Sequence, residues 1–298
     1  MTKAIRMYET GGPEVLRWEE DDPGKPGTGE ALVRHEAVGL NFIDVYHRTG
    51  LYPLPSLPAV PGLEGAGIVE EIGDGVTEVS VGDRVAYAAI PPGAYAETRR
   101  IPAHRLVKLP DGISTSQGAA MMLQGMTARY LLKGCYDVKQ GDVILIHAAA
   151  GGVGCALLHL GNIVECQMTG VVGSSHKVNE TLRYGADFVI DTSKEDLWIK
   201  AEDISPEGFD VIFDGNGPAT LKQSYRHLAP VGKLVTYGFH SMLSKRGGVF
   251  NYPKLALQYF RLPRWNPLKM TNENKSLIAF NLSYLFNRAD LLEEAMQN

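Results

Sequence analysis

The stretch Gly141–Gly154, which reads Gly-Asp-Val-Ile-Leu-Ile-His-Ala-Ala-Ala-Gly-Gly-Val-Gly, decides the fold of this protein. Its apolar run Val143–Ile146 predicts a buried strand of a parallel sheet. The small-residue turn Ala148–Gly154 comes next, and the segment Val153–Leu160 predicts a helix. A strand, a glycine-rich turn and a helix place free backbone N–H groups at the positive end of a helix dipole, where a pyrophosphate can bind. Such a turn taken alone is equally consistent with an ordinary tight turn.

The sequence after this turn decides between the two interpretations. Further short apolar runs occur, with helix-compatible segments between most of them: Met168–Val172, Phe188–Ile190, Val211–Phe213, Lys233–Tyr237 and Leu277–Leu282. Strands that alternate with helices predict a parallel α/β sheet. We therefore predict a Rossmann domain, with a doubly wound parallel sheet, over residues 123–282.

The first part of the sequence has a different pattern. Short β-like runs are separated by turns rich in Gly, Pro and Asp: Ala4–Tyr8, Ala31–Val38, Ala66–Ile72 and Arg84–Ala88. This pattern predicts a compact, β-rich domain over residues 1–122. The segment Ile113–Leu132, with Ser114 as its N-cap, predicts a helix that leads into the Rossmann domain.

Composition excludes several classes of protein. The net charge of −5 argues against a general nucleic-acid binder. The three cysteines have no paired spacing, which indicates a reducing compartment without a disulfide framework. No apolar signal-peptide core follows Met1, and a glycine cluster and two histidines interrupt the most apolar window, Val143–Leu160. We therefore expect a cytoplasmic protein without a transmembrane segment.

A set of motifs occurs in a fixed order along the sequence: Asn41-Phe42-Ile43-Asp44, Arg48–Pro53, Pro61–Gly67, Val81–Val85, Gly93–Glu97 and Gly141–Gly154. This order resembles the quinone oxidoreductase (zeta-crystallin-like) branch of the zinc-free medium-chain dehydrogenase/reductases. The second half is similar to the subgroup of synaptic-vesicle membrane protein homologues. The resemblance implies a GroES-like catalytic domain, a Rossmann domain, an NADPH site in the cleft between them, and a homodimer.

The sequence does not predict a zinc site. Zinc needs three or four converging thiolate, imidazole or carboxylate ligands. Zinc-dependent relatives have a cysteine where this protein has Asn41 and a histidine where it has Leu63, and the four-cysteine zinc lobe is absent. Cys155 and His159 share a helix face in the predicted helix but lack a third ligand, so packing is the better interpretation of that pair. We expect no metal.

The residues after the second Rossmann strand favour NADPH over NADH. NAD-preferring sites place Asp or Glu about 20 residues beyond the glycines, where it binds the ribose 2′-hydroxyl. Here that position holds Gly173-Ser174-Ser175-His176-Lys177, which contains no acid. A pair of hydroxyls and a lysine would accept a 2′-phosphate, whereas a carboxylate would repel it. The alternative is that Ser174 or Ser175 only caps the next helix and that Lys177 is solvated.

The resemblance also implies a set of cofactor contacts, many of them at the C-terminal ends of strands, where doubly wound folds bind ligands. For any single residue, ordinary loop packing remains the alternative. The expected contacts are Phe42, Asp44, Thr127, Ala150, Gly151, Gly152, Val153, Gly154, Gly173, Ser174, Lys177, Asn216, Gly217, Gly238, Phe239, Phe280 and Leu282.

Catalysis should need little from the protein, because hydride or electron transfer is the chemistry of the cofactor and a reduced quinone takes its protons from solvent. Tyr52 is the best candidate for a polar group at the substrate, since it matches a tyrosine of related enoyl reductases. A half-buried aromatic of the β-rich domain is the alternative. Asn41 could hydrogen-bond a substrate carbonyl or a neighbouring loop, and Tyr46 is a third candidate.

The sequence departs from the family pattern in several places. His159 stands where relatives have a glutamine, and the same helix contains Gly161 and Asn162, the glycine costing about 1 kcal/mol relative to alanine. Asp191-Thr192 stands where relatives often have a tyrosine. Residues 283–298 predict the start of a return to the catalytic domain that the sequence does not complete.

The segment Tyr252–Met270 mixes aromatic and basic residues. It could form a peripheral membrane or partner contact, or a cleft-lining helix and loop packed on its own domain. Taken together, the sequence predicts an NADPH-dependent, zinc-free reductase of quinones. The alternatives are a 2-alkenal or enoyl reductase and an NADPH-binding structural or vesicle-trafficking protein with little turnover.

Overall fold

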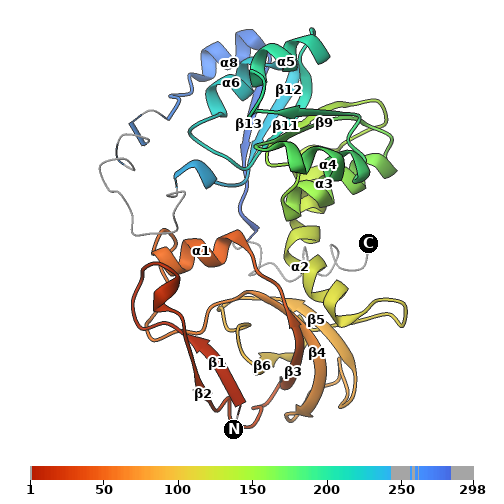
Figure 1. Ribbon diagram of the computed structural model, residues 1–298. Helices are drawn as coiled ribbons and strands as arrows, with labels where there is room; N and C mark the ends of the chain where they lie inside the picture. The colour runs from red at the N-terminus through yellow and green to blue at the C-terminus, as the bar shows by residue number, and fades with distance from the viewer. Residues whose placement is uncertain (1, 243–255, 257–258, 261, 283–298) are drawn as a thin grey trace. The chain divides into compact units, whose positions relative to one another are not determined.

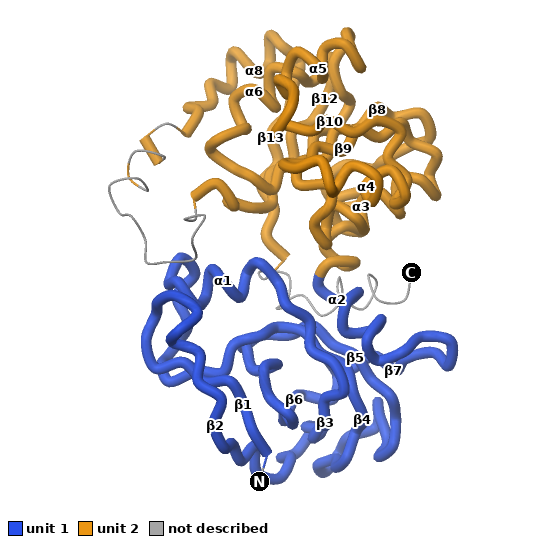
Figure 2. The backbone as a smooth tube through the Cα atoms, in the orientation of Figure 1, with its two compact units in different colours: residues 1–123, 245–250, 286–298 blue, residues 124–244, 251–285 orange. Residues whose placement is uncertain are grey.

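The structure of the protein is a computed structural model that describes residues 2–242, 256, 259–260 and 262–282. The described residues divide into two compact units (Figure 2). Unit 1 contains residues 2–123, and unit 2 contains the described residues from 124 to 282. The predicted C-terminal return, 283–298, lies outside the described residues.

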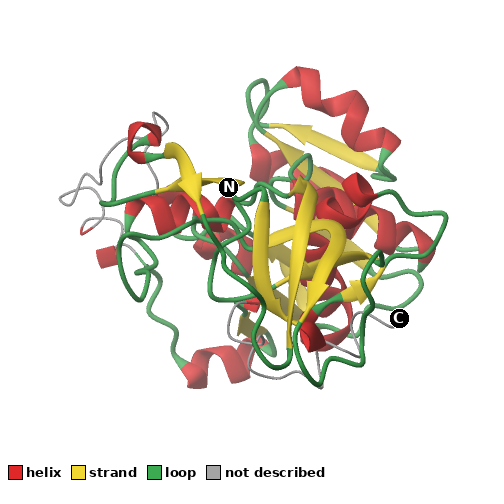
Figure 3. Cartoon of the chain, turned by 90° about the horizontal axis from the view of Figure 1, so that it is seen from below, coloured by secondary structure: helices red, strands yellow, loops and turns green. Residues whose placement is uncertain are grey.

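Unit 1 is built from antiparallel strands. A five-stranded sheet has the order β6-β3-β4-β5-β7, and β1 pairs with β2 in a separate two-stranded sheet. The strands of the larger sheet bend strongly (Figures 1 and 3). Its elements are β1 (Thr2–Arg6), β2 (Arg17–Asp21), β3 (Glu30–Val38), α1 (Phe42–Thr49), β4 (Glu64–Ile72), β5 (Arg84–Ala88), β6 (Thr98–Pro102), β7 (Val107–Lys108) and the first half of α2 (Thr115–Tyr130).

The larger buried cluster of unit 1 lies on one face of this sheet, and a smaller one, with Ala66 and Ala86, packs on Ala119 of α2. Val33, Val69, Val85 and Ile101 come from neighbouring strands and are all fully buried. Because successive side chains in a strand point to opposite faces, the residues between them face away from this core. The alternating runs of the sequence thus become the inward face of a β-rich domain, as predicted. Only the first run differs, since β1 ends at Arg6 and Met7 forms an isolated bridge with Ala59.

Unit 2 is a doubly wound parallel sheet. Its strand order is β10-β9-β8-β11-β12-β13, and every neighbouring pair is parallel. Numbered along the sequence this is the order 3-2-1-4-5-6 of the Rossmann fold, so the predicted fold class is confirmed. The strands are β8 (Val143–Ile146), β9 (Gln167–Val172), β10 (Phe188–Asp191), β11 (Phe209–Asp214), β12 (Leu228–Thr236) and β13 (Ser276–Ala279).

Helices cover both faces of this sheet. Ile144 and Ile146 of β8 pack with the end of α2 and with α3 (Gly152–Ile163), whereas Leu145 packs with α5 (Leu197–Ile204) and α6 (Leu221–Arg226). Helices α4 (Val178–Arg183) and α8 (Pro267–Glu273) also belong to unit 2. Successive side chains of β8 therefore point into two different layers of helices. A parallel strand that is covered on both faces needs apolar residues at every position, which explains the continuous apolar run.

In unit 2, three element boundaries differ from the sequence prediction by three or more residues. Helix α3 continues through Gly161 to Ile163. A Cβ at Gly161 would lie 2.4 Å from the Met168 sulfur, so the glycine lets β9 pack close to the helix. Strand β12 begins at Leu228, five residues before the predicted Lys233, with a register shift opposite β11. Strand β13 ends at Ala279 rather than Leu282.

Helix α2 begins as predicted, with Ser114 as its N-cap. The Ser114 hydroxyl accepts a hydrogen bond from the Gln117 N–H at 3.2 Å, and the Gln117 amide oxygen accepts one from the Ser114 N–H at 2.9 Å. This reciprocal pair is a capping box. At its other end α2 passes into a π-helical turn, Leu131–Cys135.

The three cysteines are free thiols, Cys135 and Cys155 half-buried and Cys166 buried. Burial raises the pKa of Cys135 and of Cys166 to about 11, and it also raises the pKa of Cys155. Within the part of the sequence that the structure describes, no helix has both the length and the apolar character needed to cross a bilayer.

Candidate functional site

The glycine-rich turn follows β8 and leads into α3, as predicted. Ala148, at the start of the turn, has a φ of 52°, a left-handed conformation that is uncommon for a residue with a side chain and is found at many functional turns. Gly151 is the N-cap of α3 and provides no side-chain cap. The first intrahelical bond joins the Cys155 N–H to the Gly151 carbonyl at 2.8 Å, so the N–H groups of Gly152, Val153 and Gly154 precede the helical ladder.

Close packing against backbone requires a glycine at position 154, whereas at position 152 a side chain would displace the end of Gln124. A Cβ at Gly154 would lie 2.6 Å from the carbonyl oxygens of both Ala148 and Ala149. A Cβ at Gly152 would lie 1.9 Å from the Gln124 amide oxygen. Gly151 and Gly152 are nevertheless exposed, so the end of α3 is an accessible and uncapped helix N-terminus. This combination suits an anion, because it offers backbone donors and the positive end of the helix dipole.

The loop after β11 lies next to this turn, because β8 and β11 are adjacent parallel strands at the switch point of the sheet. Asp214, the last residue of β11, is fully buried, and its Oδ1 accepts hydrogen bonds from the N–H groups of Asn216 (2.9 Å) and Gly217 (3.0 Å). Gly217 has a φ of 81°, which suits glycine. Asp214 therefore fixes the backbone of a loop that was predicted to contact the cofactor.

The loop after β12 packs on the loop after β11. The His240 N–H donates to the Gly215 carbonyl at 3.2 Å, and the Ser241 N–H donates to the Asn216 carbonyl at 3.0 Å. A Cβ at Gly238 would lie 2.7 Å from the Gly215 carbonyl oxygen. The predicted contacts Asn216, Gly217, Gly238 and Phe239 are thus brought together at one end of the sheet.

The segment after β9 carries the residues expected to read the 2′-phosphate. A Cβ at Gly173 would meet nothing within 4 Å, and Lys177 is exposed. The Ser175 hydroxyl donates to the Asp191 carboxylate at 2.6 Å, and this hydrogen bond helps to lower the pKa of Asp191. The Ser175 hydroxyl is thus already donated to Asp191 and is not available to a phosphate. Ser174 is the member of the expected hydroxyl pair that could donate to the 2′-phosphate.

Three expected contacts lie on α2 and after β13. Phe280 stacks on Tyr130 with ring centroids 4.6 Å apart and an interplanar angle of 13°. Its backbone N–H donates to the Thr236 carbonyl at 2.9 Å, which fixes Phe280 just beyond the sheet edge. Thr127 and Leu282 are both buried. Phe280 is the half-buried member of this group and presents an aromatic ring held by its neighbour.

In unit 1, the candidate Asn41 is hydrogen-bonded to a buried carboxyl group that sequence reasoning missed. The Asn41 Nδ2 donates to Glu64 Oε1 at 2.6 Å, and the Leu123 N–H donates to Glu64 Oε2 at 2.6 Å. Glu64 is fully buried, and burial raises its pKa from 4.5 to about 7 despite these two hydrogen bonds. Of the two roles considered for Asn41, the structure favours bonding to a neighbouring segment.

Asp44 has a similar structural role at the start of α1. Its Oδ2 accepts hydrogen bonds from the Asn41 N–H and the Tyr95 hydroxyl, both at 2.8 Å. Its Oδ1 is buried without a hydrogen-bond partner among the described residues, and burial raises the pKa of this carboxyl group. Asp44 therefore orders the helix start, and its expected contact with the cofactor stays a prediction.

The aromatic candidates of unit 1 form one group on α1 and the turn after it. Tyr46 is buried between Phe42 and Tyr52, with ring centroids 5.4 Å and 5.0 Å away. Tyr52 is half-buried, and its N–H donates to the Tyr46 carbonyl at 3.2 Å. Phe42 is 45% exposed. Tyr46 is thus more buried than Phe42 and Tyr52, and the roles expected for the three residues stay predictions.

Metal ligands do not converge anywhere in the described part of the protein: no group of three or more His, Cys, Asp and Glu residues there could hold a metal ion. Cys155 and His159 do lie on the same helix. The Cys155 thiol faces the Ala149 carbonyl at 3.6 Å, and His159 packs on the Tyr184 ring.

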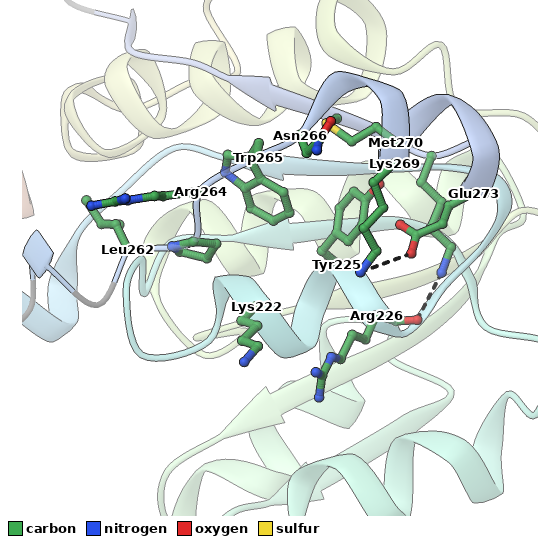
Figure 4. A pocket seen from close by; sticks show the side chains of 12 residues that line it. Lys222, Tyr225, Arg226, Leu262, Arg264, Trp265, Asn266, Lys269, Met270 and Glu273 are labelled. Atoms are coloured by element: carbon green, nitrogen blue, oxygen red, sulfur yellow. Dashed lines mark hydrogen bonds and ion pairs between the residues drawn. The ribbon is translucent and has the colours of Figure 1, made fainter.

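A separate pocket of about 460 Å³ lies in unit 2 between α6 and α8 (Figure 4). Trp265 packs on Tyr225 at its centre, with ring centroids 4.7 Å apart, and Arg264 and Lys269 are exposed. The pocket lies near the beginnings of β12 and β13, away from the glycine-rich turn at the strand ends. Within Tyr252–Met270, the side chains of Leu262, Trp265 and Met270 pack on their own domain, whereas Tyr259 and Phe260 are exposed. Residues 252–255, 257–258 and 261 lie outside the described residues.

The fold and the turn define a Rossmann-type dehydrogenase or reductase with a GroES-like partner domain. Two protein families match the sequence: the alcohol dehydrogenase GroES-like domain over residues 27–111 and the zinc-binding dehydrogenase family over residues 152–263. A quinone oxidoreductase of Pseudomonas aeruginosa is 39% identical over 307 residues, covering 100% of this protein and 92% of the relative. The crystal structure of Escherichia coli quinone oxidoreductase complexed with NADPH superimposes with a TM-score of 0.87 at 34% identity, over 99% of this protein and 86% of that structure.

Two further relatives carry other names. A 2-haloacrylate reductase of Burkholderia sp is 38% identical over 248 residues, covering 81% of this protein and 74% of the relative. The human synaptic vesicle membrane protein VAT-1 homolog is 33% identical over 271 residues, covering 91% of this protein and 68% of the relative. The protein belongs to the quinone oxidoreductase family, and the resemblance inferred from its motifs is confirmed.

Proposed function

We propose that the protein is an NADPH-dependent oxidoreductase that reduces quinones. The observation that carries this proposal is the uncapped N-terminus of α3, at the switch point of a sheet with the 3-2-1-4-5-6 order. Family membership supports the same activity, because the Pseudomonas and Escherichia relatives are quinone oxidoreductases.

The residues present fit a dinucleotide. The N–H groups of Gly152, Val153 and Gly154 would hold the pyrophosphate, and the exposed Lys177 with Ser174 would hold the 2′-phosphate. Asn216, Gly217, Gly238 and Phe239 would border the nicotinamide half, with Phe280 held against Tyr130. The bound NADPH would supply the hydride, and the protein would bind and orient it.

At the substrate, Tyr52 is the residue we assign to a quinone oxygen. It is half-buried and its ring is fixed by Tyr46, so its hydroxyl has a defined position from which to donate a hydrogen bond. Asn41 would position rather than contact the substrate, because its amide is held by Glu64. No acid or base is required beyond this, since solvent can protonate the reduced quinone.

Replacing Lys177 tests the cofactor assignment. Lys177→Ala should raise the Kd for NADPH about tenfold and leave the Kd for NADH unchanged, because only NADPH carries the 2′-phosphate. Isothermal titration calorimetry measures both constants. Lys200→Ala is the control, since Lys200 is an exposed lysine of α5 in the same unit. Equal affinity of the wild-type protein for the two cofactors, unchanged in Lys177→Ala, would contradict the assignment.

Replacing Tyr52 tests the substrate assignment. We expect Tyr52→Phe to lower kcat/KM for an ortho-quinone about tenfold with the Kd for NADPH unchanged, because only the hydroxyl is removed. NADPH oxidation is followed at 340 nm. Tyr8→Phe is the control, since Tyr8 is an exposed tyrosine bonded to Glu19. Wild-type activity in Tyr52→Phe would show that Tyr52 is a packing residue.

A specific relative favours a second substrate class. The 2-haloacrylate reductase reduces an activated alkene by name, so the assay includes an enal beside the quinone. A higher kcat/KM for the enal would assign the protein as an alkene reductase. Tight NADPH binding without turnover of either compound would leave the non-enzymatic role. A homodimer and a cytoplasmic location also stay proposals, and light scattering of the purified protein tests the first.

A further inference from the structure

A buried network of polar side chains lies behind the loop that follows β11 in unit 2. Its members are Asp214, Ser224, His147 and Asn216, and we call it the His147 network. His147 follows β8, Asp214 ends β11, and Ser224 lies in α6. These three side chains are all 0% exposed, whereas Asn216 is half-buried. Neither His147 nor Ser224 has a role in the proposed function.

The two oxygens of Asp214 have different partners. Oδ1 accepts hydrogen bonds from the N–H groups of Asn216 and Gly217 and from the Thr220 hydroxyl, the last at 3.0 Å. These bonds hold the backbone of the loop. Oδ2 accepts a hydrogen bond from the Ser224 hydroxyl at 2.8 Å. The hydroxyl hydrogen of Ser224 therefore points at Asp214 and is not available to another acceptor.

The direction of the Ser224 hydroxyl determines which ring nitrogen of His147 carries the hydrogen. The Ser224 Oγ lies 3.0 Å from His147 Nε2, and because its own hydrogen points at Asp214, it can only accept there. Nε2 must therefore carry a hydrogen. Burial lowers the pKa of His147, so the ring is neutral and has only that one N–H. Its Nδ1 presents a lone pair.

The lone pair on His147 Nδ1 determines which way the side-chain amide of Asn216 is oriented. Asn216 Nδ2 lies 3.4 Å from His147 Nδ1, the longest hydrogen bond of the network. Because Nδ1 can only accept, the NH₂ group of Asn216 faces His147 and the amide oxygen faces the other way. The amide oxygen makes no hydrogen bond to a described residue, and it is not among the buried polar atoms that lack a partner. It is therefore open to a ligand.

We propose that the His147 network makes Asn216 Oδ1 a fixed hydrogen-bond acceptor for bound dinucleotide, so that the group it meets is a donor. The donors of the nicotinamide half are the ribose hydroxyls and the carboxamide NH₂, whereas a phosphate oxygen has no hydrogen to give. This inference rests on the proposed function, because it takes NADPH as the ligand. His147 and Ser224 are positioning residues in this scheme, and Asn216 is the residue that touches the cofactor.

A double-mutant cycle tests the scheme, and the measured quantity is the affinity of the protein for NADPH. Asn216→Ala should weaken binding about tenfold and Ser224→Ala about threefold. Because Ser224 acts through Asn216, Ser224→Ala should have no further effect in the Asn216→Ala protein. A purely structural serine would instead weaken binding equally in both backgrounds, and that additivity would overturn the proposal.

Two controls distinguish the proposed effect of Ser224 from a general loss of stability. Thr169→Val removes another fully buried hydroxyl of unit 2, which has no hydrogen-bond partner among the described residues, and should leave the affinity for NADPH unchanged. If Ser224→Ala does not fold, Ser224→Thr keeps the hydroxyl and should keep the affinity, whereas Ser224→Val has a similar volume and should lose it. Equal affinities of Ser224→Thr and Ser224→Val would overturn the proposal.

The protonation of His147 is tested without any cofactor. Nitrogen-15 NMR of the free protein should show a neutral ring with the hydrogen on Nε2, and a hydrogen on Nδ1 would overturn the orientation of Asn216.

The 3-acetylpyridine analogue of NADPH, which lacks the carboxamide NH₂, separates the two donors. The loss of affinity in Asn216→Ala persists with this analogue if Asn216 binds a ribose hydroxyl, and it disappears if Asn216 binds the carboxamide. No binding of NADPH by the wild-type protein would refute the proposed function while the NMR result stands.

Discussion

Ionisation of Glu64 should destabilise the protein as the pH rises. The carboxyl group is fully buried, and its pKa is raised from 4.5 to about 7. A group whose pKa is higher in the folded state contributes stability below its unfolded pKa and loses it as the pH rises through the folded pKa. A shift of this size corresponds to about 3 kcal/mol of unfolding free energy, lost between roughly pH 4.5 and pH 8.

The variant Glu64→Gln isolates this effect because glutamine resembles the protonated acid and does not titrate. The NH₂ group of the glutamine faces one of the two N–H donors, which costs the same free energy at every pH. We therefore expect the stability of Glu64→Gln relative to the wild type to rise by about 2–3 kcal/mol from pH 5 to pH 8. The comparison must use the difference between the two proteins, since burial also lowers the pKa of His35 to about 4. His35 has the opposite sign: it contributes stability above pH 6.5 that is lost as the pH falls through its folded pKa.

Urea unfolding at several pH values measures this difference. Trp18 is the single tryptophan among residues 1–123, so its fluorescence reports on unit 1 in a protein that carries Trp198→Phe and Trp265→Phe. The carboxyl carbon of Glu64 can also be titrated directly by NMR, its signal being the one absent from Glu64→Gln. A stability difference that does not change with pH, or a carboxyl group that titrates near 4.5, would refute the reasoning.

Two changes in unit 2 test the turn and a helix cap. Gly154→Ala should lower the unfolding free energy by about 2 kcal/mol, because its Cβ would press on the Ala148 and Ala149 carbonyls, whereas Gly125→Ala, in open space on α2, should be neutral or stabilising in thermal unfolding. Equal effects at both glycines would contradict this. Asp196→Ala should cost about 1 kcal/mol in the same assay, because the carboxylate caps α5 by accepting from the Trp198 and Ile199 N–H groups. Asp203→Ala, 65% exposed, is the control, and a loss as large there would argue against the cap.

The parts of the fold that follow from local patterns could be predicted from the sequence. The apolar run of β8, the glycine-rich turn and the alternation of strands and helices together fix a Rossmann sheet, because each depends on residues close in sequence. Gly161 shows where this reasoning fails. The residue is a poor helix former, yet the close packing of Met168 requires a glycine at that point of α3.

The polar networks of the site could not be predicted in this way. Asn41 and Leu123 lie 23 and 59 residues from Glu64, and His147 lies 77 residues from Ser224. No periodicity connects such positions, because hydrogen bonds between distant segments depend on the completed fold. The sequence pointed to Asn41 and Asn216 as candidates, whereas the structure adds the buried residues that hold them.

The burial of the three thiols has a consequence for an enzyme that handles electrophiles. Quinones and enals add covalently to thiolates, and the thiolate is the reactive form of cysteine. With a pKa of about 11, Cys135 and Cys166 are thiolates in only about one molecule in ten thousand at pH 7, compared with a few per cent for an unperturbed cysteine. The small thiolate fraction of Cys135 and Cys166 should therefore slow their alkylation by the compounds that the protein would reduce.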